Sequence, residues 1–477
     1  MRHWRCWLAT VLALLLGVPL QAQRDEAKAL DTLTLYQLPL SRAFAATNET
    51  ELLAPIAALH LTGLAGEVIL ARIGATPSSA ARDLAASVSF PGGELAWAES
   101  IFLFADRPAE TEPMLTGWLT LSLPPKAEPG TYQGTLAVRS AGREAQLPLA
   151  VTVSEGRLGP SGPQYLLLSP SPARSEPEKA PLPPGLPSFW AGASEVSFLS
   201  LAEQNGDVGL DLSALNAAAD RVAPPFGTEQ PLPVFLGPLL SRLCQQFAVE
   251  PRSATYVLAY HSILSQLRDW AKARGVTLIF VPPADEDGST PDPRSLEQDL
   301  LILRETPEVA VLLPADPVLS FSRPDQQRLL DLAQACLART REGVLLAAKP
   351  KGQSLPLWLQ VAEGDRLRAG FWAETVGATV VLVTAEGRPE DRLWTLAAQN
   401  DARYLATLKA LLARADASKD PAAKQSVRSA QADVEQLSRE LDQVTRETTD
   451  RPVGDAELDR WRDTLRQDIA RLSELLP

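Results

Sequence analysis

The chain has 477 residues, which is long enough for two or three domains with full-sized hydrophobic cores. Hydrophobic residues make up 45% of it and charged residues 22%, an ordinary balance for a globular protein and too polar for one that crosses a membrane many times. The net charge of -13 repels nucleic acid and anionic lipid, so neither is expected as a partner. Neutral ligands are not disfavoured by it.

The N-terminus has the layout of a secretory signal peptide. Arg2 and Arg5 precede the apolar run Trp7–Leu16, a glycine and a proline then interrupt it, and Ala22 offers a small residue for cleavage. A membrane anchor needs about 20 apolar residues, and this run is shorter, so no membrane span is expected. We therefore predict that residues 1–22 are removed and that the mature protein is secreted or periplasmic.

Cysteine and histidine are scarce in the predicted mature chain. Cys244 and Cys336 are its two cysteines, and the sequence leaves open whether they pair; we favour buried free thiols. His60 and His261 are its two histidines, too few for a His/Cys metal cluster. The H-E-x-x-H, G-x-S-x-G, G-x-G-x-x-G and P-loop patterns are absent, so we predict no metal site and no cofactor. His261 falls on the apolar stripe of an expected helix and is interpreted as a core residue.

Residues 23–158 are predicted to form a β-sandwich domain. Leu119, Leu121 and Leu123 alternate with polar residues, and Pro129-Gly130 follows as a turn. A period of two with turns this close together is typical of antiparallel sheets that bury one face. The segment Glu155–Pro163, rich in glycine and proline, is the predicted boundary of this domain.

Residues 159–389 are predicted to form an α/β domain resembling a TIM barrel, because short apolar segments alternate there with amphipathic ones. Six or seven strands can be placed, which leaves a shortened barrel and an open sheet as alternatives. The predicted helices include Thr255–Arg274 and Pro324–Arg339, and the predicted strands include Tyr165–Leu168, Leu232–Leu236, Val276–Val281, Val309–Leu313, Val344–Ala348 and Thr379–Val383.

Residues 390–477 are predicted to be helical. Val427, Leu437 and Leu441 belong to one stripe of apolar residues three and four apart, and Leu458 and Leu465 belong to another. The stripes are too short for an extended rod, so a helical hairpin or bundle packed on the barrel is expected. The alternative is that this tail serves as an oligomerisation surface.

Several phrases of the chain, in this order, resemble glycoside hydrolase family 123 and the related family called domain of unknown function 4091. That resemblance implies an N-terminal β-sandwich, a degenerate TIM-like barrel and a helical tail. The phrases are Gly66-Glu67, Pro124–Thr135 with its Pro-Gly-x-Tyr-x-Gly core, Trp270–Gly275 followed by a strand and Asp285-Glu286, Arg368 with Trp372, and Asp401 with Tyr404-Leu405.

The resemblance implies a retaining β-N-acetylhexosaminidase of the N-acetylgalactosaminide type that acts on glycans. Its substrate's own acetamido group is the nucleophile, Glu286 is the general acid/base, and Asp285 orients and stabilises the acetamido group. Adjacent residues have Cα atoms about 3.8 Å apart, whereas an ordinary retaining pair flanks the bond with carboxylates about 5–5.5 Å apart. The adjacency therefore favours substrate assistance. The candidate substrate-binding residues are Arg368, Trp372 and Trp358.

Several features of the chain depart from the family and leave two other interpretations open. Asp285–Gly288 is also typical of a solvated turn, and Asp287 stands where the family usually has proline. Thr384-Ala385 stands where relatives commonly have a tryptophan, and the predicted strand Val344–Ala348 lacks aromatic residues near its end. One alternative is a non-catalytic carbohydrate-binding or scaffolding protein with a degenerate barrel, and another is an envelope assembly protein that uses its helical tail.

Overall fold

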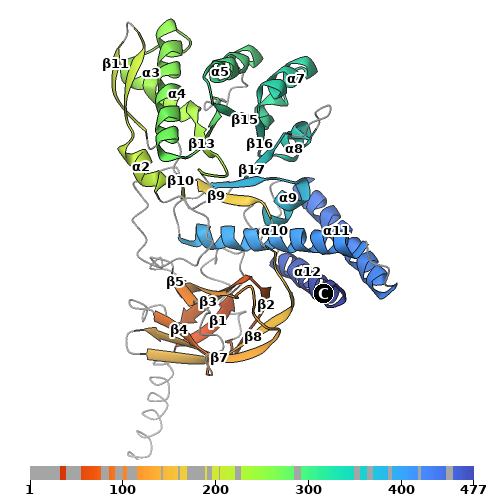
Figure 1. Cartoon of the computed structure of the whole chain (residues 1–477). Coiled ribbons are helices and arrows are strands. Elements are labelled where there is room, and N and C mark those ends of the chain that lie inside the picture. The colour runs from red at the N-terminus through yellow and green to blue at the C-terminus, as the bar shows by residue number, and fades with distance from the viewer. Residues whose placement is uncertain are drawn as a thin grey trace, which may run out of the picture. The chain divides into compact units, whose positions relative to one another are not determined.

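A computed structural model of the chain describes most of its residues and divides it into two compact units, Met1–Leu158 and Gly159–Pro477 (Figure 1). The described residues are 33–38, 55–76, 85–91, 100–104, 115–140, 143–159, 162–168, 189–190, 196–202, 205–220, 227–283, 292–348, 355–361, 369–384, 389–416, 421–446 and 455–476.

The first unit is built from two four-stranded sheets, in the orders β1-β3-β6-β5 and β2-β8-β7-β4. Their buried side chains form one hydrophobic cluster, to which Ile73 and Leu119 contribute from the first sheet and Leu136 and Leu149 from the second. The strands are β1 (Thr34–Leu38), β2 (Leu59–Ala65), β3 (Val68–Thr76), β4 (Ala85–Ser89), β5 (Ser100–Phe104), β6 (Leu115–Ser122), β7 (Gly130–Ser140) and β8 (Arg143–Arg157).

The pairing in these sheets only partly matches the predicted antiparallel pattern. β7 and β8 form an antiparallel hairpin, but β2 runs parallel to β8. Strand β6 is buried on both faces at its centre, since Thr120 is as inaccessible as Leu119 and Leu121. β8 also extends to Arg157, into the predicted boundary segment Glu155–Pro163.

The second unit contains a parallel sheet whose strands follow the cyclic order of a (β/α)8 barrel. The sheet order is β10-β9-β18-β17-β16-β15-β14-β13, and every neighbouring pair is parallel. The strands are β9 (Gln164–Leu168), β10 (Phe189–Trp190), β13 (Leu232–Phe235), β14 (Leu278–Val281), β15 (Ala310–Pro314), β16 (Ala335–Ala338), β17 (Leu357–Val361) and β18 (Val380–Thr384).

The first long strand, β9, pairs with the last, β18, as closure of such a barrel requires. Among the described residues no pairing joins β10 to β13, so the sheet curls as a half-barrel with an opening at that place. The structure thus has more strands than the six or seven that the sequence revealed. Of the two alternatives considered, it is nearer to a barrel with a gap than to a flat open sheet.

One predicted strand was wrong, and three strands of the parallel sheet, β10, β16 and β17, were not predicted. Val344–Ala348 lies almost wholly in helix α8 (Arg341–Ala347), which begins where the hydroxyl of Thr340 accepts a hydrogen bond from the amide of Gly343. The predicted helix Pro324–Arg339 is only half correct, because helix α7 (Arg323–Leu332) ends at Leu332 and β16 follows. β17, with Trp358 in it, was not predicted. The predicted strand whose end lacked aromatic residues therefore does not exist, because Val344–Ala348 is almost wholly helical.

Helices cover the sheet on the outside, and a short hairpin precedes β13 (Figure 1). The hairpin strands and these helices are β11 (Ser197–Ala202), β12 (Asp207–Asp211), α2 (Ser213–Ala219), α3 (Leu236–Phe247), α4 (Ala254–Arg274), α5 (Pro293–Glu305), α6 (Ala315–Val318), α7 (Arg323–Leu332) and α9 (Ala369–Val376).

Helix α4 illustrates how local sequence sets these boundaries. The hydroxyl of Ser253 accepts a hydrogen bond from the amide of Tyr256 at the start, and Gly275 ends the helix in the left-handed conformation, with φ of 65°. His261 was predicted to be a core residue, and this prediction was wrong. Its side chain is 34% exposed, and its Nε2 lies 3.9 Å from a carboxylate oxygen of Glu305.

Three long helices, α10 (Pro389–Asp416), α11 (Pro421–Arg446) and α12 (Asp455–Leu475), form the tail and pack on the parallel sheet's outer layer. The hydroxyl of Tyr165 on β9 donates to the carbonyl of Ala398 on α10 at 3.2 Å. A Cβ on Gly370 of α9 would lie 2.0 Å from the same carbonyl oxygen, so only glycine permits this approach. Lys409 pairs with Glu374 at 3.1 Å.

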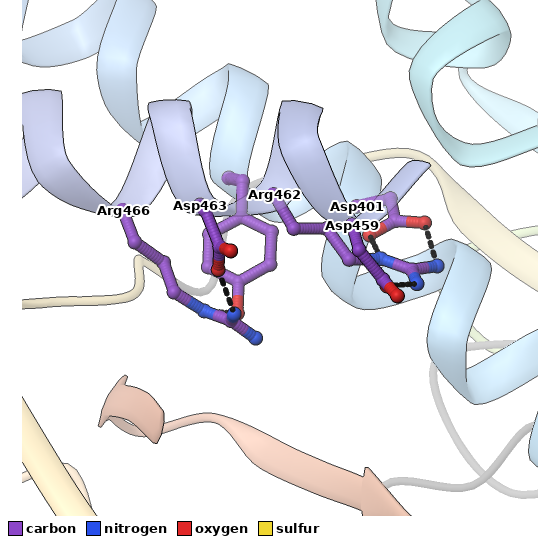
Figure 2. A network of polar contacts seen from close by, with 6 residues as sticks. Asp401, Asp459, Arg462, Asp463 and Arg466 are labelled. Carbon is purple, nitrogen blue, oxygen red and sulfur yellow. Dashed lines mark hydrogen bonds and ion pairs between the residues drawn. The ribbon is translucent and has the colours of Figure 1, made fainter. Parts of the chain in front are cut away.

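A buried ion pair joins α12 to α10. Arg462 donates to both carboxylate oxygens of Asp401, at 2.8 and 2.7 Å, and its third contact is with Asp459 at 3.1 Å. Figure 2 shows the guanidinium lying between the two carboxylates, with Arg466 beyond. The side chains of Arg462 and Asp401 are 8% and 1% exposed, so each depends on the other for its solvation. Arg466 donates to the hydroxyl of Tyr404 at 2.7 Å, so the Asp401 phrase of the sequence holds the tail in place.

Removing one partner of this pair should cost much more stability than removing both. Asp401→Asn leaves Arg462 buried with a weaker partner, and we expect the free energy of unfolding to fall by about 3–5 kcal/mol. The double variant Asp401→Leu/Arg462→Met removes both charges and should recover most of that loss. Chemical denaturation monitored by circular dichroism measures both values. Additive losses in the double variant would contradict the coupling.

Asp468 is a buried carboxyl on α12 beside another carboxyl. It is 1% exposed, its Oδ1 lies 3.3 Å from Arg471, and its Oδ2 has no hydrogen-bond partner among the described residues. Burial, together with the neighbouring carboxylate of Asp433 on α11, raises the pKa of Asp468 to about 6. The folded state therefore binds this proton more tightly than the unfolded chain does. The contribution of Asp468 to the free energy of unfolding therefore falls as the pH rises from about 4 through 6.

Asp468→Asn should stabilise the second unit above pH 6 by about 1–3 kcal/mol, because no charge is then buried, and should have little effect at pH 4. Melting temperatures measured between pH 4 and 8 would show a flatter profile than for the unmodified protein. Asp463→Asn, at a 63% exposed side chain of the same helix, is the control. Identical pH profiles for the two variants would refute the assignment.

Within the described ranges, no helix combines the length and the hydrophobicity that a membrane crossing demands.

Both Cys244 and Cys336 are free thiols. Cys336 lies in the core, where burial raises the pKa of its thiol to about 12, and Cys244 is half-buried.

Candidate functional site

The register of the parallel sheet shows which side chains face its concave side. Tyr165 reaches α10, so it lies on the outer, helix-covered face. Its register partner Val381 shares that face, as does Leu359, the partner of Val381 on β17. Since side chains alternate along a strand, Trp358 and Gln360 lie on the opposite, concave face.

A polar pair lies on this concave face at the carboxyl ends of β16 and β17. Arg339 directly follows β16 and is exposed, and its Nε donates to Oε1 of the half-buried Gln360 at 3.0 Å. Trp358 lies one pleat further down the same strand. In parallel α/β folds the carboxyl edge of the sheet is where ligands bind, so this pair marks the candidate site.

Asp316 fixes the backbone beneath this pair. It lies in α6, directly after β15, and its carboxylate accepts hydrogen bonds from the amides of Arg339 at 2.7 Å and Thr340 at 3.0 Å. The hydroxyl of Thr340 also donates to it. A Cβ on Gly343 would come within 2.6 Å of the same carboxylate, so α8 can approach this closely only with glycine there. The loops after β15 and β16 are thereby tied together.

The predicted catalytic and binding residues are distributed as follows. Asp285, Glu286 and Arg368 lie outside the described residues; Asp285 and Glu286 belong to the segment between β14 and α5, and Arg368 immediately precedes α9. Trp358 and Trp372 are described, at 2% and 7% exposed, and both belong to the hydrophobic core of the second unit. Most of each ring thus contacts protein rather than solvent.

A second group of titratable side chains lies between α4 and α5. Burial raises the pKa of Asp299 to about 7, against the opposing effect of the Arg252 guanidinium. Tyr260 is fully buried, and its hydroxyl has no hydrogen-bond partner among the described residues. The group belongs to the helical layer outside the sheet, so it does not face the concave surface.

A cavity of about 70 Å³ lies between α11 and α12. Glu440 lines it and accepts hydrogen bonds from Trp461 at 2.6 Å, Arg460 at 2.7 Å and Gln436 at 2.9 Å. Its carboxylate is thus fully engaged by protein donors. Across the described part of the chain, no cluster of three or more histidine, cysteine, aspartate or glutamate side chains could hold a metal ion.

Comparison with solved structures shows a likeness in fold that extends over most of the chain. A family 123 glycoside hydrolase from Clostridium perfringens, described for glycolipid glycan hydrolysis, superposes with a TM-score of 0.54 at 10% identity, covering 87% of this chain and 99% of that one. The chain is similar to this enzyme in fold. Its two units and parallel sheet thus have a counterpart in a glycoside hydrolase.

A family 10 xylanase from termite gut that contains a bacterial Ig-like domain gives a TM-score of only 0.29 at 9% identity, covering 72% of this chain and 99% of that one. No protein-family model matches the sequence, and no curated protein matches it either.

Sequence reasoning missed Asp316, Arg339 and Gln360. Gln360 lies in a strand that was not recognised, and Arg339 stands at the end of a segment predicted as helix. The available signal was the short apolar run Ala335–Ala338 followed by Arg339-Thr340, in which threonine is a good N-cap for the next helix. This signal would have indicated a strand at Ala335–Ala338 and the start of a new helix after Thr340.

Asp316→Ala should loosen the carboxyl edge, because two amides and one hydroxyl lose a charged acceptor. We expect a loss of about 1.5–3 kcal/mol in unfolding free energy. Hydrogen exchange should speed up at the amides of Arg339 and Thr340. Asp331→Ala, which removes one exposed hydrogen bond from Gln327 at 2.8 Å, is the control and should cost little. Unchanged exchange at Arg339 in the Asp316 variant would contradict this account.

Proposed function

We propose that this is an exported glycoside-hydrolase-like protein that cleaves β-N-acetylhexosaminides with retention and substrate assistance. Glu286 is the general acid/base, and Asp285 orients the substrate's acetamido group. The observation that carries the proposal is the strand order of the second unit. Asp285-Glu286 belongs to the segment that leaves the carboxyl end of β14, in a sheet arranged as a barrel. The likeness in fold to a family 123 glycoside hydrolase supports it.

Chemistry also supports this division of roles. Two adjacent carboxylates cannot easily flank a glycosidic bond from opposite sides, as a conventional retaining pair does. With the acetamido oxygen as nucleophile, one protein carboxyl is enough for proton transfer. Keeping Glu286 protonated near neutral pH means raising its pKa from about 4.3 toward 6–7, which costs roughly 3 kcal/mol. A neighbouring Asp285 carboxylate acts in that direction.

The second candidate function is a non-catalytic carbohydrate-binding or scaffolding protein with the same frame. The burial of Trp358 and Trp372 favours it, because a sugar pocket needs flat aromatic surface that the ligand can reach. In the described strands around Arg339, the concave edge offers polar groups rather than an exposed ring. Arg368 and the two tryptophans remain predicted substrate contacts within the first proposal.

Hydrolysis of an aryl β-N-acetylhexosaminide distinguishes the two functions. The unmodified protein should release the aryl group with retention, and Glu286→Gln should lower kcat by about 10²–10⁴-fold, toward the low end because an aryl leaving group needs less protonation. Asp285→Asn should also lower kcat, since the developing charge on the acetamido group loses its partner. Glu305→Gln, on the exposed end of α5, is the matched control and should keep full activity.

A substrate with hydroxyl in place of the acetamido group should not be cleaved, because no protein nucleophile is proposed. Its cleavage at a comparable rate would eliminate substrate assistance. Binding of N-acetylhexosaminides without any hydrolysis would favour the non-catalytic alternative.

A further inference from the structure

Arg339 carries a positive charge on the concave face, and no carboxylate of the described residues pairs with it. Within the described ranges its side chain forms one hydrogen bond, in which Nε donates to the neutral amide of Gln360 at 3.0 Å, and no ion pair. The neighbouring Arg341, in contrast, pairs with Asp442 at 3.3 Å. A guanidinium has five N–H donors, and none of the described residues bonds to either terminal nitrogen of Arg339.

The position of this guanidinium is set in advance by two contacts. Asp316 binds the amide of Arg339 at 2.7 Å and so fixes the residue's backbone, while Gln360 holds Nε. An arginine that is already oriented loses little rotamer entropy when a ligand binds. Because glutamine is uncharged, it orients the guanidinium without neutralising it.

The terminal nitrogens of a guanidinium match two oxygens of a carboxylate or a sulfate ester better than they match a sugar hydroxyl. The carboxylate of Asp316 is not the partner of these terminal nitrogens. Its oxygens accept hydrogen bonds from the backbone amide of Arg339 and from the amide and hydroxyl of Thr340. The net charge of -13 slows the approach of an anion, but screening over about 8 Å at physiological salt leaves contact pairs nearly intact.

We propose that Arg339, oriented by Gln360, binds an anionic group of an acidic glycan, a carboxylate or a sulfate ester, at the carboxyl edge of the sheet. This inference rests on the proposed function for the ligand being a glycan, and it adds the class of glycan. It does not depend on whether the protein cleaves that glycan.

Calorimetric titration of the full chain tests the proposal with three oligosaccharides. One alternates glucuronate with N-acetylhexosamine, the second is the same compound carrying sulfate esters, and the third is an uncharged N-acetylhexosamine oligomer of equal length. We expect at least one acidic oligosaccharide to bind more tightly than the uncharged one. Binding of the unsulfated compound assigns the site to a carboxylate, and binding that requires sulfation assigns it to a sulfate ester.

Two variants identify the residue responsible. Arg339→Gln should weaken acidic binding on the order of 10- to 100-fold, because a charged hydrogen-bonding partner is lost, and should leave binding of the uncharged oligomer unchanged. Gln360→Glu should produce a similar loss while Arg339 is still present, because the new carboxylate pairs with it. Arg304→Gln, with the same change of charge at the exposed end of α5, is the control and should bind as the unmodified protein does.

Equal affinity for acidic and uncharged oligomers, no binding of any of the three, or an acidic preference that survives Arg339→Gln would each overturn the proposal. Failure of the hydrolytic function has a different signature. In that case no N-acetylhexosaminide is cleaved, but the preference for acidic oligosaccharides and its loss in Arg339→Gln persist.

Discussion

The pairing of β9 with β18 is the interaction on which the rest of the second unit depends. It joins the first long strand of the parallel sheet to the last in a continuous register from Gln164 to Leu168. The sheet therefore curls with all its carboxyl ends at one edge, and its outer face is defined by Tyr165 reaching α10. The tail then packs on that outer face, where Arg462 and Asp401 hold α12 against α10. Arg339 and Gln360 lie on the concave face because of the same register.

The elements with strong local signals could be predicted from the sequence. Helix α4 has an apolar stripe with Ser253 before it and Gly275 after it, and the structure begins and ends it within a residue of the prediction. Strands β14, β15 and β18 are apolar runs bounded by polar or turn residues, and each was placed to within two residues. In these segments the residue pattern and the tertiary environment agree, so local reasoning was sufficient.

The errors concentrate between α7 and β17, where local pattern and fold disagree. Ala335–Ala338 consists of small and apolar residues that continue a helical pattern, and only the sheet around it makes it a strand. Val344–Ala348 is an apolar run of strand length, yet the Thr340 cap and the close packing of Gly343 on Asp316 make it helical. A short apolar run cannot be assigned from periodicity alone. The Arg339–Gln360 contact could not be predicted for the same reason. It depends on the register between β16 and β17, and neither strand was recognised in the sequence.

The two proposed roles of the carboxyl edge involve neighbouring parts of the sheet. Asp285-Glu286 belongs to the segment after β14, Asp316 follows β15, and Arg339 follows β16. Adjacent strands are about 4.8 Å apart, so β14 and β16 are separated by roughly 10 Å along the sheet, a distance longer than a pyranose ring. A glycan whose N-acetylhexosamine reaches the segment after β14 would therefore present the next sugar to Arg339. A carboxylate or sulfate on that next sugar, rather than on the N-acetylhexosamine itself, is what this spacing favours. Under the proposed mechanism, the acetamido group would then stay free to act as the nucleophile.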